Sequence, residues 1–484
     1  MKTNRKQEVR NQDFSDTSDS THQMAVITDL PTELIDIILS DVPLTTHLAL
    51  LYTCRRLYTL TKPRIYRKVS LYLDCHSTLE NLETSKRRLV CLCRTLYCSD
   101  VASLVKEFDI QGFKPSTVHP QHRYEQRYSE WFPRELRSTP AYKLWKEQGL
   151  AGNTDILIAS IIFAMRNMRV LHLDFDFWVT ESPCLTHVLS NMNELRHVNF
   201  YPREYDAYDH HRPQSTNPYG SFFMEQLIAV LRLPRVESVA CQVGESKMPM
   251  SWLTRFLKNI SCSSLKRLYL ERSEIHQRLL GHVLRATPRL EEIVYDLCIN
   301  IHYNRSLTSW FNCRVMDNTL SSLKQTLRYL YINVKFDPVF DYIDELDNDD
   351  FDLSYFHQGI QNTMRSLVNF PNLTELSIPI IALLGWNSVE NTQLADVLPR
   401  SLRHLLLTVD NISSTFDAYH WSNADLIDRV DMFVRRGSCD RLVFLALWLP
   451  VTKVTDSSVQ ASCRLAVDCF EAGIECIIDP DLDH

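Results

Sequence analysis

The chain has 484 residues, of which 45% are hydrophobic and 23% charged, the composition of a folded, water-soluble protein with more than one ordinary core. Its formal net charge of −7 excludes the strongly basic surface of a typical nucleic-acid-binding protein, so nucleic acid is not an expected partner. The longest apolar runs, 156–165 and 442–451, are about half of the roughly 20 residues that a membrane-spanning helix needs, so no membrane is expected either.

The amino-terminal part of the sequence predicts a tail and then three short helices. Residues 1–23 are polar and predict a disordered tail. Pro31 suits the first turn of a helix, and apolar residues recur after it at helical spacing, so we expect a helix over 31–39. Pro43 separates this helix from a second apolar series, and Thr53 is a suitable capping residue for a third helix.

Three helices of this length cannot bury all of their apolar side chains, so the surplus predicts a surface that docks on a partner. Residues 24–70 resemble an F-box, because they contain Leu-Pro-Thr-Glu-Leu at 30–34, Cys-Arg-Arg-Leu-Tyr at 54–58 and Pro-Arg-Ile-Tyr at 63–66. The resemblance implies that this segment binds the Skp adaptor and, through it, the cullin-RING ubiquitin ligase of the SCF type. The residues that it implies for adaptor binding are Leu30, Pro31, Glu33, Leu34, Ile37, Ile38, Leu44, Leu48, Cys54, Leu57 and Tyr58. The alternative is a helical hairpin that merely caps a larger domain.

Residues 71–103 predict a connecting helical segment. Three cysteines lie close together in it, at Cys91, Cys93 and Cys98. A zinc site needs four ligands in a tetrahedron, and no second pair lies at a useful spacing, so we expect no metal here. The 14 cysteines of the chain lie without regular spacing, which favours reduced thiols in the cytoplasm or the nucleus.

The remainder of the sequence, 104–484, contains a repeated pattern, apolar-x-x-apolar-x-apolar. The nine copies begin at Met168, Leu195, Val236, Leu265, Leu290, Leu327, Leu373, Leu402 and Leu442. We expect a helix, a short turn and a strand in each unit, with 105–110 opening the array and 474–478 closing it. The pattern resembles irregular leucine-rich repeats, although the asparagine ladder of that family is mostly missing. The resemblance implies an α/β solenoid with short parallel strands on a concave face and helices on the convex face. Plain strands of an α/β domain are the alternative.

Three insertions interrupt the repeats, at 112–153, 201–219 and 336–353. The first two are rich in aromatic residues, His and Arg, which suit recognition loops. The alternative for the first is a cap over the exposed end of the array, and the alternative for the second is a solvated connection. The third carries eight acidic residues, which favour a solvated loop and would otherwise attract a basic partner.

Basic and aromatic residues occupy many of the x positions of the repeats, which we expect to face the concave side. The candidate substrate-binding residues among them are Arg169, Arg196, His197, Arg267, Tyr269, Arg328 and Arg403. Arg forks pair well with carboxylate and phosphate, so we hypothesise an acidic or phosphorylated ligand. These side chains could instead serve only to keep the strand surface soluble.

No Gly-x-x-x-x-Gly-Lys loop and no Gly-x-Ser-x-Gly elbow occurs in the sequence, so we expect no enzymatic activity, catalytic residue or cofactor. The sequence instead predicts a substrate-recognition subunit of an SCF-type ubiquitin ligase, which binds the Skp adaptor through the F-box and an unknown protein substrate through the repeats. The alternative is a non-catalytic scaffold that binds the same partners without directing ubiquitination.

Overall fold

The structure is a computed structural model. It describes residues 30–73, 79–112, 154–173, 183–200, 224–243, 260–273, 275–299, 311–336, 360–385, 392–409, 421–437, 440–449 and 455–479, together with 143, 255 and 257. The expected tail and the whole of 201–219 lie outside the described residues, as do the insertion 112–153 apart from 112 and 143 and the insertion 336–353 apart from 336. The chain divides into two compact units, Met1–Ile65 and Tyr66–His484, which are described separately.

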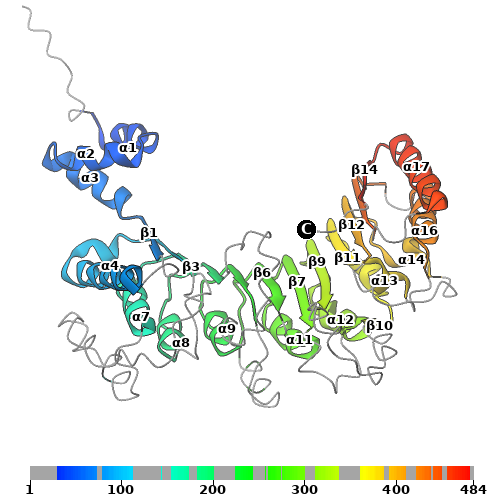
Figure 1. The fold of residues 1–484 in the computed structure, drawn as a ribbon, viewed down its shortest axis with the longest axis horizontal. Coiled ribbons are helices and arrows are strands. Elements are labelled where there is room, and N and C mark those ends of the chain that lie inside the picture. Colours follow the sequence, from blue (N-terminus) through cyan, green and yellow to red (C-terminus); the bar gives the residue numbers. More distant parts are fainter. Residues whose placement is uncertain are drawn as a thin grey trace, which may run out of the picture. The chain divides into compact units, whose positions relative to one another are not determined.

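The described part of the first unit contains three helices, α1 (Thr32–Ser40), α2 (Leu44–Leu51) and α3 (Arg55–Ile65) (Figure 1). Its small core is formed by Ile35, Leu39 and Leu57. Polar contacts, among them the following two, also tie the helices together. The buried His47 ring lies 2.9 Å from the Leu39 carbonyl oxygen, and the Arg64 guanidinium lies 3.1 Å from the Asp36 carboxylate.

The third helix begins differently from the sequence-based expectation. The Thr53 hydroxyl donates to the Leu50 carbonyl oxygen at 2.8 Å instead of capping α3. The Cys54 sulfur takes the capping position, since it accepts a weak hydrogen bond from the Leu57 N–H at 3.5 Å. The chain therefore still satisfies one of the unpaired N–H groups at the start of the helix.

The second unit is built on one parallel sheet whose strands follow one another in chain order. The strands are β1 (Lys68–Leu73), β2 (Glu107–Gly112), β3 (Val170–Leu173), β4 (His197–Phe200), β5 (Ser238–Cys241), β6 (Arg267–Ser273), β7 (Glu292–Ile299), β9 (Tyr329–Phe336), β11 (Glu375–Pro379), β12 (His404–Thr408), β13 (Phe444–Trp448) and β14 (Glu475–Asp479). Two further short strands, β8 (Phe311–Asn312) and β10 (Ile360–Gln361), pair only with each other.

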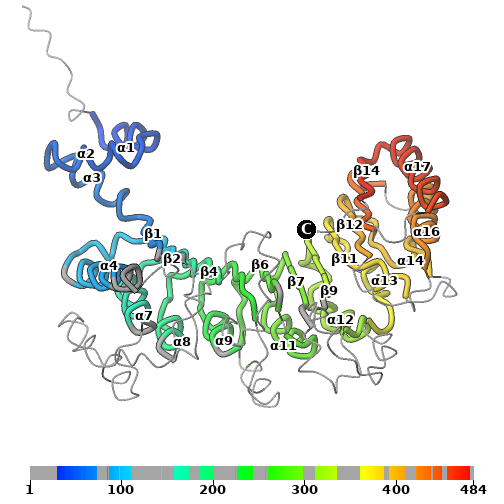
Figure 2. The backbone as a smooth tube through the Cα atoms, viewed as in Figure 1, coloured from blue at the N-terminus to red at the C-terminus, as the bar shows by residue number. Residues whose placement is uncertain are grey.

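Helices connect the strands and lie along one face of the sheet (Figures 1 and 2). They are α4 (Leu79–Cys98), α7 (Thr154–Ala164), α8 (Pro183–Leu189), α9 (Met224–Leu231), α11 (Gln277–Ala286), α12 (Cys313–Leu320), α13 (Ile380–Leu384), α14 (Leu394–Val397), α16 (Asn423–Arg435) and α17 (Asp456–Glu471), with 3₁₀ turns at Asp100–Ser103, Ser321–Leu323 and Leu367–Asn369. Neighbouring helices pack on each other, as α4 does on α7 and α16 on α17.

The repeated apolar pattern explains this arrangement. In β3, Leu171 and Leu173 are buried, while the alternate residues Val170 and His172 are half-buried. Side chains alternate between the two faces of a strand, so the apolar pair points to the helices and the x residues point away from them. The same alternation in successive strands produces one continuous core between sheet and helices.

All nine strands predicted from the repeats are present, and β2 and β14 lie where the opening and closing strands were expected. The expected start of the array is wrong, because β1 precedes β2 and pairs with it from Lys68 to Leu73. Residues 66–70, which the F-box resemblance included, and the helix within 71–103 therefore belong to the second unit. The alternation in Lys68–Leu73 indicates a strand, but it was hidden by its position directly after a helical motif.

Successive strands are joined at their amino-terminal ends by a recurring pair of backbone hydrogen bonds. The Arg169 carbonyl oxygen, for example, accepts from the N–H groups of Arg196 and His197 at 2.8 and 3.0 Å. The residues in this position form a row along the sheet edge, which we call the rim: Arg67, Lys106, Arg169, Arg196, Glu237, Lys266, Glu291, Arg328, Thr374, Arg403 and Val443.

Candidate protein-binding surfaces

The first unit exposes a group of large apolar side chains on α1 and α2. We call Leu34, Ile37, Ile38, Leu44 and Leu48 the α1–α2 surface, and all five were predicted to bind the adaptor. Ile37 and Leu44 are the most exposed of them, at 63% and 57%. Ile35 and Leu39 occupy the one face of α1 that reaches the core, so the helix leaves its remaining apolar residues in contact with solvent.

The other residues predicted to bind the adaptor differ in accessibility. Pro31, Glu33 and Tyr58 are exposed. Leu30 and Cys54 are half-buried against the small core, and Leu57 is part of that core with 4% of its surface exposed. Leu57 is therefore not available to a partner while the unit is folded, and the sequence-based assignment of it to the surface is wrong.

In the second unit, one face of the sheet points away from the helices. We call this face the open face. His197, Arg267 and Tyr269 lie on it, since they occupy the alternate positions of β4 and β6 opposite to the buried residues. The predicted residues Arg169, Arg196, Arg328 and Arg403 lie instead on the rim, directly before their strands. The structure thus splits the predicted set between a face and its edge.

His197 and Arg267 on the open face and Arg169 and Arg196 on the rim form a group that we call the basic cluster. The pKa of His197 is lowered, first by its partial burial and then by the charge of Arg267, with a smaller effect of Arg196. His197 is therefore neutral at pH 7, and the positive charge of the cluster comes from the arginines. Arg196 itself pairs with Glu237 of the next repeat, at 3.1 Å from Nη1 to Oε1.

Acidic side chains from neighbouring repeats contact several of the predicted residues. The Tyr269 hydroxyl donates to the Glu292 carboxylate, and Arg328 Nη1 lies 3.8 Å from Glu291 Oε2. Burial and the hydrogen bond to Glu292 raise the pKa of Tyr269, so its hydroxyl stays protonated. Sequence reasoning missed the Arg196 partner, Glu237, although it occupies the same x position one repeat later.

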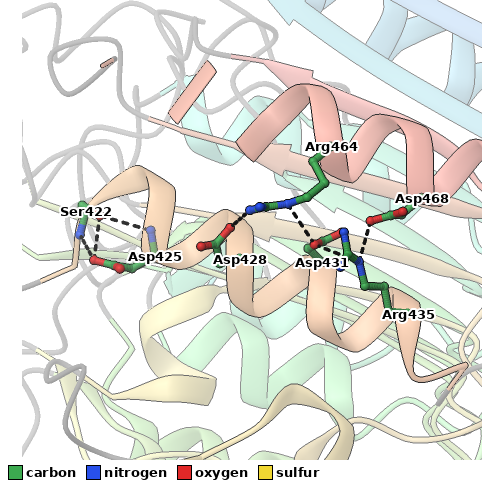
Figure 3. Close-up of polar contacts among 7 residues, drawn as sticks. All are labelled: Ser422, Asp425, Asp428, Asp431, Arg435, Arg464 and Asp468. Carbon is green, nitrogen blue, oxygen red and sulfur yellow. Dashed lines mark hydrogen bonds and ion pairs between the residues drawn. The ribbon is translucent and has the colours of Figure 1, made fainter. Parts of the chain in front are cut away.

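A separate ionic network joins α16 to α17 (Figure 3). Arg435 Nε lies 3.2 Å from Asp431 on its own helix and 2.7 Å from Asp468 on α17. Arg464 of α17 reaches back to α16, where it pairs with Asp428 and lies 3.3 Å from Asp431. Each arginine therefore bridges two carboxylates, and the network fastens the last two long helices to each other.

Asp431 is the buried centre of this network, with 4% of its surface exposed. Burial, followed by its hydrogen bond with Asp468, raises the pKa of Asp431 to about 6, against the lowering effect of the two arginines. The pKa of Asp468 is lowered by the same hydrogen bond and by Arg435. The more exposed carboxyl therefore keeps the negative charge, and Asp431 holds a proton in mildly acidic solution.

Within the described ranges, no three His, Cys, Asp or Glu side chains are arranged to hold a metal ion. Of the three neighbouring cysteines, Cys93 is buried in the core and Cys91 is exposed, while the side chain of Cys98 is not described. No helix in the described part of the chain is both long and apolar enough to cross a membrane. No protein-family model and no curated protein sequence matches the chain.

Proposed function

We propose that this chain is the substrate-recognition subunit of an SCF-type ubiquitin ligase. The first unit binds the Skp adaptor through the α1–α2 surface, and the second unit binds a protein substrate through its strands. Transfer of ubiquitin is the work of the partner subunits, and this chain contributes proximity, which raises the effective concentration of the substrate.

The observation that carries this proposal is the exposure of the α1–α2 surface. Five leucine and isoleucine side chains on two adjacent short helices are 40–63% exposed, although the described part of the unit has a core of only three residues. Complete burial of one such side chain contributes about 1.5–3 kcal/mol, so docking of this partly exposed group supplies several kcal/mol. The motifs at 30–34, 54–58 and 63–66 add the resemblance to an F-box, which points to the Skp adaptor as the occupant.

A substitution test can separate binding from folding, because the key side chains are already in contact with solvent. We expect the double variant Ile37→Asp/Leu44→Asp to lose co-purification of the Skp adaptor by at least about tenfold, since charges then face an apolar partner. Val368→Asp is the matched control, because Val368 is a similarly exposed apolar residue, at 42%, in the second unit.

Circular dichroism of the double variant should match that of the wild type. Full adaptor binding by a folded double variant would contradict the assignment.

A substrate receptor and a scaffold differ in their effect on the abundance of the bound partner. Deletion of the chain should raise the abundance of a captured partner if the chain directs ubiquitination, and unchanged abundance of every partner would favour the scaffold.

A further inference from the structure

The last strand of the sheet, β14, has a strand partner on one side only within the described part of the chain. The Glu475 N–H donates to the Val443 carbonyl oxygen at 2.9 Å, and the Asp479 carbonyl oxygen accepts from the Leu449 N–H at 3.0 Å. Alternate residues of a parallel strand direct their backbone groups to opposite sides. The N–H and C=O groups of Cys476 and Ile478 therefore point to the outer edge.

Helix α17 carries an apolar stripe on the side that faces away from α16. Arg464 and Asp468 mark the side of the helix that contacts α16. On the roughly opposite side, exposed residues recur at helical spacing: Val459, Cys463, Ala466 and Phe470. Phe470 is 84% exposed and Val459 is 50% exposed, which is unusual for a phenylalanine and a valine on one stripe.

Internal repeats of the array present the same two features to their neighbours, a strand edge and an apolar helix side. Terminal repeats of stacked arrays normally have a polar outer face, because nothing packs beyond them. An exposed strand edge beside large apolar side chains is a template for an added strand from another chain. The described carboxyl-terminal end thus has the character of an interface and not of a cap.

Charge indicates what kind of chain fits this end. Between 456 and 479 the sequence holds five acidic residues and one basic residue, Arg464, which is engaged with α16. Glu471 and Glu475 are both exposed beside the apolar stripe and the strand. Glu475 and Ile477 share one face of β14, while Cys476 and Ile478 are half-buried against the core on the other.

The same charges disfavour a second copy of this chain as the occupant. A two-fold symmetric strand pair that uses the whole of β14 is antiparallel and centred on Ile477. That pairing places Glu475 directly opposite Asp479 of the other copy, twice, and like charges in this position are repulsive. The carboxylates at the same positions would attract the side chains of a basic segment.

We propose that β14 and the apolar stripe of α17 bind an extended segment of a partner protein, which adds to the sheet as a further strand and carries alternating apolar and basic side chains. The apolar side chains contact Cys476, Ile478 and Phe470. The basic side chains lie on the open-face side, next to Glu475. This site uses residues distinct from the α1–α2 surface and does not depend on adaptor binding.

The test uses the full chain and labelled peptides of about eight residues, long enough to pair along β14. A peptide of alternating Lys and Val should bind in fluorescence anisotropy, and one of alternating Glu and Val should not. Phe470→Asp and Glu475→Arg should each weaken binding of the first peptide at least about tenfold. Val368→Asp and Asp440→Arg are the matched controls, since both residues are exposed outside β14 and α17 and their substitution should leave binding unchanged.

Hydrogen exchange provides the second measurement. The amides of Cys476 and Ile478 should exchange rapidly in the free chain and become protected when the Lys/Val peptide is present. Equal binding of both peptides, no binding of either, or binding without protection of these amides overturns the proposal. A concentration-dependent dimer that is abolished by Phe470→Asp would assign the edge to a second copy and would equally overturn it.

Discussion

At Asp431, burial raises the pKa of the carboxyl more than the two neighbouring arginines lower it. Arg435 and Arg464 both approach its Oδ2 atom, yet its pKa is raised to about 6, because the carboxyl is almost fully buried. Its Oδ1 atom is buried without a hydrogen-bond partner within the described structure. A proton on Asp431 removes the cost of an incompletely solvated charge and allows the carboxyl to share a hydrogen bond with Asp468.

This raised pKa predicts a pH-dependent contribution to stability. Between the ordinary Asp pKa of 3.8 and about 6, the folded chain holds a proton that the unfolded chain has released. The contribution of Asp431 to the free energy of unfolding is therefore fully present below the ordinary pKa and falls as the pH rises through about 6. In Asp431→Asn the side chain is neutral at every pH, so this fall is absent.

Urea unfolding at about pH 5 and about pH 7 measures the effect. From the lower to the higher pH, we expect the wild type to lose on the order of 1 kcal/mol relative to Asp431→Asn. Asp440→Asn is the control, because Asp440 is exposed, and it should show no such change. A constant difference between the wild type and Asp431→Asn would mean that Asp431 is ionised throughout this range.

At the scale of strands, the open face and the rim predict different effects of charge reversal. Arg267 lies on the open face and Arg169 lies on the rim, and no acidic partner contacts either one within the described residues. If an acidic or phosphorylated segment binds here, Arg169→Glu/Arg267→Glu should reduce capture of the substrate about tenfold or more and leave adaptor binding unchanged.

The matched control for this pair is Arg278→Glu/Arg314→Glu, since both of these arginines are exposed at the start of helices α11 and α12. Quantitative mass spectrometry of captured proteins is the measurement. An unchanged set of captured proteins in the Arg169/Arg267 variant would move recognition away from the basic cluster.

The strands were predictable from the sequence and their lateral contacts were not. Each apolar-x-x-apolar-x-apolar copy specifies a half-buried strand locally, so all nine were correct. The partnership of Arg196 with Glu237 depends on the register between strands 41 residues apart, which no local pattern contains. Leu57 was misassigned for a related reason, because helical spacing shows which residues share a face but not which face the core takes.

At the scale of the molecule, the second unit is a single stacked array with one continuous core. A fragment that ends after Ala286 would leave β6 without β7 and would expose the side of α11 that packs on α12. Because each repeat is stabilised by its neighbours, we expect this fragment to lose cooperative melting or to melt on the order of 10 °C lower. Circular dichroism melts of fragment and full chain compare the two, and an unchanged melting temperature would indicate two independent domains.

Backbone hydrogen bonds at the rim join the repeats whatever side chain the rim residue carries. From Arg67 to Arg403, a backbone carbonyl oxygen accepts two N–H groups from the next repeat at each step, whether the residue that supplies it is Arg169, Glu237 or Thr374. Peptide groups are the same in every residue, so this join is indifferent to the side chain that stands there. Rim residues can therefore be exchanged one by one, even with reversal of charge, while the repeats stay joined. An array joined in this way allows the side chains that contact a ligand to change while the fold stays the same.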